Sequence, residues 1–97
     1  MQPSWFIFEL GIAIFPEAQG RGLGSDAVAT LVAHLFRALD AARVQASTSV
    51  ANLGMQRLLE RLGFAREGVM RAFMPAPGGR EDYVLYAVTR SDWEARS

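Results

Sequence analysis

The residues best suited to chemistry form one short glycine-rich stretch. In order, they are Gln19, Gly20, Arg21, Gly22, Leu23 and Gly24. This stretch stands between an apolar run, residues 5–15, and a run with helical spacing, residues 24–39. Glycine lets the backbone approach a ligand closely, and the first amides of a helix have no partner within the helix. Because the helix dipole also favours negative charge there, the stretch predicts a turn that binds a phosphate.

Three phosphate-binding patterns can be compared with this stretch. A Walker A loop needs a lysine, and the chain contains none. The dinucleotide pattern Gly-x-Gly-x-x-Gly is only half met, because Ser25 stands where the third glycine belongs. The pattern Gln-x-x-Gly-x-Gly is met in full by Gln19, Gly22 and Gly24. The pattern Gln-x-x-Gly-x-Gly is therefore favoured. How strongly it indicates phosphate binding depends on the secondary structure expected on either side of it.

The elements on either side predict a parallel strand–helix–strand unit. Residues 5–15 are aromatic and β-branched, which indicates a buried strand that ends at Pro16. An apolar stripe then follows at helical steps, and His34 beside it is expected to be a partly buried structural histidine. The stripe consists of Val28, Leu31, Val32, Leu35, Phe36 and Leu39. Residues 43–50 form the second strand, which the helix length makes parallel to the first.

The second half of the chain predicts one more helix and a hairpin. Asn52 is a good N-cap, and Gly63 is a natural residue to follow the end of the helix. The buried face of this helix carries Met55, Leu58, Leu59 and Leu62. Strands are expected over residues 64–73 and 83–88, joined by a loop at 75–79 and followed by a short tail with Trp93. The expected fold class is therefore α/β (α+β), a mixed sheet of about four strands with two main helices in the order β-α-β-α-β-β.

Composition excludes several functions. The chain of 97 residues is expected to form a single domain over residues 1–97. Its net charge is zero and its arginines are dispersed, which disfavours nucleic acid as a partner. The chain has no cysteine and one histidine, so a metal site is not expected. Glu9 interrupts the first apolar run, which argues against a signal peptide or membrane span and favours a cytoplasmic protein.

A longer series of motifs resembles the GNAT superfamily of acyl-CoA N-acyltransferases, most closely its RimJ/RimL-like branch. After the glycine stretch come Asn52, residues 59–64 (Leu-Glu-Arg-Leu-Gly-Phe), Glu67-Gly68 with Arg71, residues 82–86, and Asp92-Trp93. The resemblance covers residues 9–93, nearly the whole chain, but corresponds only to the C-terminal half of a complete domain of this family. It implies a truncated GNAT fold that binds acetyl-CoA.

The resemblance also implies a binding role for particular residues. The loop from Gln19 through Gly20, Arg21, Gly22 and Leu23 to Gly24 would hold the pyrophosphate of acetyl-CoA through backbone amides. The backbone of Ile12, Ala13 and Ile14 would pair with the pantetheine arm where two parallel strands splay apart. Asn52 would reach the same arm, or serve only as an N-cap, and both roles are compatible.

The implied reaction is direct attack of a primary amine on the thioester. Glu9 is the only carboxylate on the first strand, so it is the candidate base, the alternative being a solvent-facing charge. The family often has a tyrosine or serine as the acid at positions that are here Leu59 and Met55, which cannot donate a proton. Tyr83 and Tyr86 are stand-ins for the acid, although packing within the sheet explains both of them.

Three functions from different classes follow. The first is an N-acetyltransferase acting on a peptide N-terminus or a small amine. The second is a non-catalytic, half-length module that binds CoA or a partner chain, and a structural subunit without ligand is a third. The strand of residues 5–15 would be an apolar sheet edge, because the strands that precede it in the family are absent. A second copy, forming a homodimer, or a separate chain is expected to cover it, unless the sequence is a fragment of a longer protein.

Overall fold

The computed structural model describes residues 7–10 and 24–96, and their elements follow the expected order with one addition. They are β1 (Ile7–Leu10), α1 (Gly24–Arg37), β2 (Arg43–Ser49), α2 (Leu53–Arg61), β3 (Ala65–Ala76), β4 (Gly79–Thr89) and α3 (Arg90–Arg96). Helix α3 is the addition, since the sequence predicts only a short tail around Trp93. A helix of seven residues is too short to show a clear period in the sequence.

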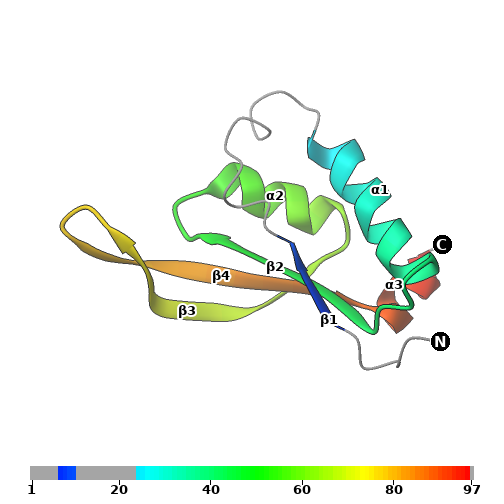
Figure 1. Ribbon diagram of the computed structural model, residues 1–97. Coiled ribbons are helices and arrows are strands. Elements are labelled where there is room, and N and C mark those ends of the chain that lie inside the picture. Colours follow the sequence, from blue (N-terminus) through cyan, green and yellow to red (C-terminus); the bar gives the residue numbers. More distant parts are fainter. Residues whose placement is uncertain (1–6, 11–23, 97) are drawn as a thin grey trace.

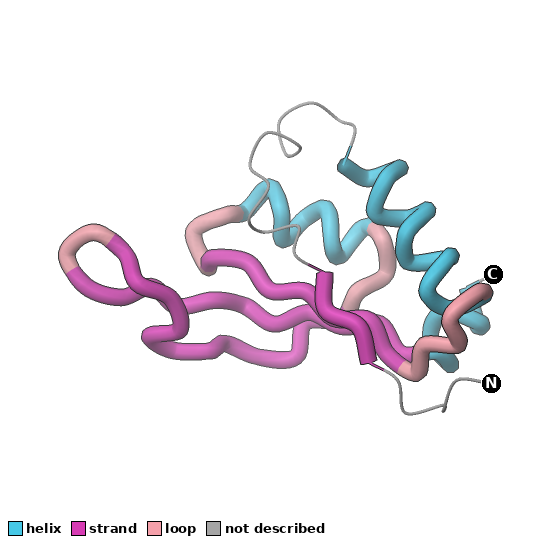
Figure 2. The backbone as a smooth tube through the Cα atoms, in the orientation of Figure 1, coloured by secondary structure: helices cyan, strands magenta, loops and turns pink. Residues whose placement is uncertain are grey.

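The four strands form one mixed sheet in the order β1-β2-β4-β3. β1 runs parallel to β2, whereas β2 and β3 are both antiparallel to β4. The predicted mixed α/β class and the parallel strand–helix–strand unit are therefore confirmed. Helices α1 and α2 lie against one face of the sheet, and none of the described helices covers the opposite face (Figures 1 and 2).

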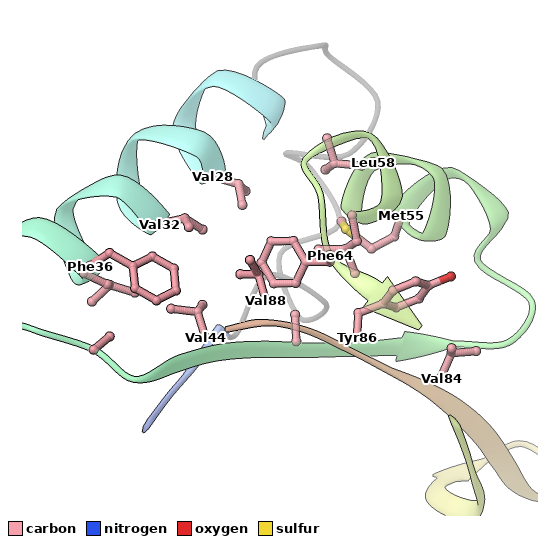
Figure 3. Close-up of a cluster of buried hydrophobic side chains, with 14 residues drawn as sticks. Val28, Val32, Phe36, Val44, Met55, Leu58, Phe64, Val84, Tyr86 and Val88 are labelled. Atoms are coloured by element: carbon pink, nitrogen blue, oxygen red, sulfur yellow. The ribbon is translucent and has the colours of Figure 1, made fainter. Parts of the chain in front are cut away.

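The core lies between the sheet and these two helices (Figure 3). Phe36 of α1 and Leu59 of α2 are almost completely buried, as are Val44 and Tyr86 on the strands beneath them. Most of the predicted apolar stripe of α1 points into this cluster, as do Met55, Leu58 and Leu59 of α2. The patterns of apolar residues in the two helices therefore predicted the inner face of each helix correctly.

Two residues of α1 differ from the prediction. Leu31 remains 41% exposed. His34 is also exposed and is not the partly buried histidine that was expected. A step of two positions along a helix rotates the side-chain direction by about 200°, so His34 points almost opposite to the buried Val32. The apolar stripe is accordingly narrower than the sequence suggested.

Helix α3 closes the end of the molecule next to α1. The ring of Trp93 stacks on Phe36 with a centroid distance of 5.1 Å and an interplanar angle of 17°. Arg90 donates hydrogen bonds to the carbonyl oxygens of Ala41 and Phe36 at 2.9 and 2.6 Å. These contacts satisfy carbonyl groups at and beyond the end of α1, which explains why so short a helix is stable.

The hairpin of β3 and β4 is longer than expected. The loop predicted at residues 75–79 is wrong, because Pro75 and Ala76 pair with Arg80 and Gly79, leaving a turn of Pro77 and Gly78. Pro75 is tolerated because β3 lies at the edge of the described sheet, where a missing amide hydrogen need not break a ladder. The hairpin extends beyond the two helices that cover the sheet (Figure 1).

Candidate functional site

The phosphate-binding turn predicted from the sequence falls largely outside the described residues. Those outside are Ile12, Ala13, Ile14, Gln19, Gly20, Arg21, Gly22 and Leu23. The last residue of the motif, Gly24, is the first residue of α1, as predicted. The elements on either side, β1 and α1, therefore have the strand and helix character that the prediction required.

The ladder between β1 and β2 is short within the described residues. It contains four register pairs and ends at Leu10 and Ala46, although β2 continues to Ser49. From Arg43 to Ser49 the other side of β2 stays paired with β4. The predicted divergence of the two parallel strands concerns Ile12 to Ile14, which lie beyond this last described pair.

Asn52 stands at the start of α2 and acts as its N-cap. Its side-chain oxygen accepts a hydrogen bond from the amide of Met55 at 3.1 Å. The loop before it is held by Gln56, whose amide nitrogen donates to the carbonyl oxygens of Ser49 and Val50 at 3.2 and 2.9 Å. Gln56 is 8% exposed and was missed by the sequence analysis, because its role depends on how the loop folds back. The carboxyl end of β2 is thus tied firmly to α2.

Glu9, the candidate base, is exposed and lies on β1 opposite Gln45 of β2. Its Oε1 accepts a hydrogen bond from Nε2 of Gln45 at 3.0 Å. Gln45 is also in register with Ala87 of β4, so these three residues share one face of the sheet. Val44 points into the core beside Gln45, so the Glu9 face is the one turned away from α1 and α2.

Arg43 connects this contact to the opposite edge of the sheet. Its Nε donates to Oε1 of Gln45 at 2.8 Å, and its two terminal nitrogens bind both oxygens of Glu67 on β3 at 3.0 and 2.7 Å. Hydrogen bonds from Arg43 lower the pKa of the Glu67 carboxyl, and the same bonds raise the pKa of Arg43. No pattern in the sequence predicts this network, since its members meet only through strand register.

The candidates for the acid differ sharply in position. Met55 and Leu59 are buried in the core and carry no transferable proton. Tyr86 is buried on the helix-facing side, where it donates a 2.7 Å hydrogen bond to Glu60. Burial, followed by this hydrogen bond, raises the pKa of Tyr86 to about 12. Tyr83 pairs with Ser49 and so lies on the same face as Glu9, about 13 Å further along the sheet.

Other kinds of site find no support in the described part of the chain. No group of histidine and carboxylate side chains there could hold a metal ion. None of the helices in residues 24–96 is long and apolar enough to cross a membrane.

Comparison with known proteins identifies the family of this chain. A family model described as an acetyltransferase (GNAT) domain matches residues 1–65. The N-acetyltransferase YoaA of Bacillus subtilis is 33% identical over 82 residues, covering 84% of this chain and 46% of that protein. The [ribosomal protein uS5]-alanine N-acetyltransferase of Escherichia coli is 33% identical over 84 residues, covering 87% of this chain and 43% of that protein.

Solved structures show the same fold. The ribosomal-protein-S5-alanine acetyltransferase of Vibrio fischeri superimposes with a TM-score of 0.71 at 29% identity, covering 80% of this chain and 43% of that one. A ribosomal L7/L12 α-N-protein acetyltransferase in complex with coenzyme A gives a TM-score of 0.68 at 27% identity, covering 76% of this chain and 42% of that one. The chain spans slightly less than half the length of these relatives. With a matching domain over two thirds of its residues and this shared fold, the chain belongs to the GNAT acetyltransferase family.

Proposed function

We propose that this chain binds acetyl-CoA and transfers its acetyl group to a primary amine, either a peptide N-terminus or a small molecule. The observation that carries the proposal is the placement of the Gln19–Gly24 motif between β1 and the first residue of α1. This placement, in a member of the GNAT family, favours the pyrophosphate of a CoA thioester as the bound anion. A relative solved with coenzyme A supports the same ligand class.

The binding roles in this proposal are divided between three parts of the chain. The amides of residues 19–24 face the pyrophosphate, and the side chain of Arg21 adds positive charge. The backbone of Ile12, Ala13 and Ile14 pairs with the pantetheine arm beyond the last β1–β2 pair. Asn52 reaches the arm from the start of α2 while its Oδ1 caps that helix. Gln56 supports this arrangement because it fixes the loop before α2.

The reaction forms a bond between the amine nitrogen and the acetyl carbon while the carbon–sulfur bond breaks. In the proposal, Glu9 takes the proton that the amine must lose, directly or through a water molecule. Its exposure and its hydrogen bond to Gln45 suit that role, because the carboxylate is accessible but held in place. Met55 and Leu59 cannot protonate the leaving thiolate, and Tyr83 lies too far along the sheet from Glu9, so solvent supplies that proton.

The buried positions of Met55 and Leu59 favour a second candidate function. A chain without a proton donor at these positions can still bind the cofactor without catalysing acetyl transfer. It would then be a non-catalytic module that binds CoA or another protein chain. The enzyme and a module that binds CoA share the binding site and differ only in turnover.

We further propose a cytoplasmic protein in which a second copy of the chain, or another chain, covers the β1 edge. β1 is the outermost strand on its side of the described sheet. It belongs to the strongly apolar sequence of residues 5–15, and exposed apolar edges promote association. Light scattering on the purified chain tests this, and a monomer that unfolds sharply would contradict it.

Titration calorimetry with acetyl-CoA and a thiol-release assay with a panel of amines test the function. We expect binding, and release of free CoA that depends on the amine. Gly22→Ala should weaken binding, because a side chain would hinder close approach of the pyrophosphate. Gly68→Ala is the matched control, since no atom lies within 4 Å of the added carbon. Absence of binding at millimolar ligand would eliminate the enzyme and the CoA-binding module, whereas binding without thiol release would leave only the module.

A further inference from the structure

We propose that Gln45, oriented by the ion pair of Arg43 and Glu67, is a positioning residue that fixes the carboxylate of Glu9. The inference rests on the proposed function, because Glu9 matters in this way only if it accepts the proton of the amine. Four residues on three strands are joined by hydrogen bonds of 2.7 to 3.0 Å. Together they form a continuous polar network on the sheet face opposite the helices.

The amide of Gln45 has only one orientation that satisfies both neighbours. Arg43 can only donate hydrogen bonds, and an ionised Glu9 can only accept them. The amide oxygen must therefore face Arg43, and the amide nitrogen must face Glu9. The distances of 2.8 and 3.0 Å agree with this orientation. The arginine thus determines which atom of Gln45 is presented to the carboxylate.

Arg43 is itself held in place by Glu67. Its two terminal nitrogens bind the two oxygens of that carboxylate, a bidentate geometry that fixes the plane of the guanidinium. The Arg43 side chain is only 24% exposed. Nε is left pointing at Gln45, so the ion pair holds the guanidinium in a definite orientation toward that amide.

A small residue on the central strand makes room for this bridge. The strand β4 lies between β2 and β3, so Arg43 must cross over it to reach Glu67. Ala87 is in register with both Gln45 and Ala65, so all three residues share the face on which the bridge runs. Ala87 is only 2% exposed although none of the described helices covers that face. Its burial is explained if the Arg43 and Gln45 side chains lie over it.

The first test concerns the contact and needs no substrate. The side-chain amide of Gln45 gives its own pair of proton signals in a nitrogen-correlated NMR spectrum of the whole chain. We expect Glu9→Gln and Arg43→Met each to move these signals, and Glu94→Gln, a change in the exposed part of α3, to leave them in place. Signals that do not respond to Glu9→Gln would overturn the inference whether or not the protein is an enzyme.

The second test separates positioning from mere structural support. Gln45→Leu should lower kcat about five- to tenfold with an unchanged KM for acetyl-CoA, because one hydrogen bond to the base is lost. The exchange Arg43→Glu with Glu67→Arg keeps an ion pair but places an acceptor beside Gln45. The amide nitrogen of Gln45 then faces position 43, and its amide oxygen turns toward Glu9. We therefore expect the exchange to lower kcat as much as Gln45→Leu does.

The outcomes distinguish this inference from the proposed function. Native kcat in the exchanged protein would show that the ion pair only supports the sheet, which overturns the inference and leaves the acetyl transfer intact. No transfer by the native chain would eliminate the proposed function, and with it any catalytic role for this network. Thermal unfolding of each variant serves as a check, and we expect the exchanged protein to unfold at nearly the native temperature.

Discussion

The phenol of Tyr86 in β4 donates a 2.7 Å hydrogen bond to Oε2 of Glu60 in α2, and so ties the sheet to the helix above it. The Tyr86 side chain is completely buried, whereas Glu60 is exposed. The phenol therefore reaches from the core to a carboxylate that water can also reach. This arrangement assigns Tyr86 to the stability of the fold, because its face of the sheet is not the one that carries Glu9.

We expect Tyr86→Phe to lower the free energy of unfolding by about 1 kcal/mol, because one hydrogen bond to a charged acceptor is lost while the ring stays buried. Glu60→Gln keeps an acceptor at the same position and should cost less. Denaturant unfolding of the two variants measures both effects. A Tyr86→Phe protein as stable as the native one would show that the bond contributes nothing.

The same residue predicts how stability depends on alkaline pH. Its pKa is raised to about 12 in the folded protein, by burial first and by Glu60 second, from an ordinary value near 10. The folded state therefore retains a proton that the unfolded chain loses, so this contribution is complete below pH 10 and is lost as the pH rises toward 12. The stability difference between the native chain and Tyr86→Phe should narrow over that range. All other titrating groups are common to both proteins, so their effects cancel in this comparison. A stability difference that stays constant between pH 10 and 12 would contradict the raised pKa of Tyr86.

The core should respond strongly to loss of a single leucine side chain. Leu59 is completely buried on the inner face of α2, so Leu59→Ala should lower the free energy of unfolding by about 2–5 kcal/mol. Leu53 on the same helix is 55% exposed and provides the control. Leu53→Ala should change stability by less than about 0.5 kcal/mol. Similar losses in the two variants would mean that α2 does not pack as described.

The residues that could be predicted from the sequence are those governed by local rules. Gly24 begins α1, and Gly63 follows α2 with a positive φ angle, and glycine is the residue that local rules predict at both positions. The parallel pairing of β1 and β2 followed from the length of the helix between them. These rules depend only on neighbours along the chain.

The residues that could not be predicted depend on contacts between distant strands. Gln45 meets Glu9 across 36 positions, and Arg43 meets Glu67 across 24, and neither pairing has a sequence pattern. Helix α3 is likewise held by the stacking of Trp93 on Phe36, which no local propensity shows. Leu31 and His34 were misplaced because the width of a helix's buried face is set by its partners and not by its own period.

Asn52 can be tested for its two roles separately. Asn52→Ala should destabilise the protein by about 1 kcal/mol, because the N-cap bond to Met55 is lost. Asn52→Asp keeps an oxygen for that bond and should retain the stability. If Asn52 also reaches the pantetheine arm, Asn52→Asp should weaken acetyl-CoA binding in calorimetry without destabilising the fold. Native affinity in this variant would restrict Asn52 to its capping role.

The end of α2 provides a prediction in which two effects can be separated. Gly63 follows the C-cap Leu62 with a φ angle of 95°, a region that residues with a side chain rarely adopt. The guanidinium of Arg96 also lies where the first side-chain carbon of any other residue would stand, because Arg96 donates a hydrogen bond to the carbonyl oxygen of Leu62. Gly63→Ala should therefore lower the free energy of unfolding by about 1–2 kcal/mol from the backbone alone, and further through the displaced arginine.

Arg96→Ala isolates the second contribution, because it removes the obstruction and one exposed hydrogen bond together. We expect Arg96→Ala to cost about 0.5–1 kcal/mol and the double variant to lose less stability than the sum of the two single variants. The shortfall measures the steric contact between position 63 and Arg96, since the backbone cost at Gly63 is common to both proteins that carry alanine there. Denaturant unfolding of the four proteins completes the cycle. Strict additivity would mean that Arg96 moves aside without cost, and the positive φ angle would then account for the whole effect of Gly63→Ala.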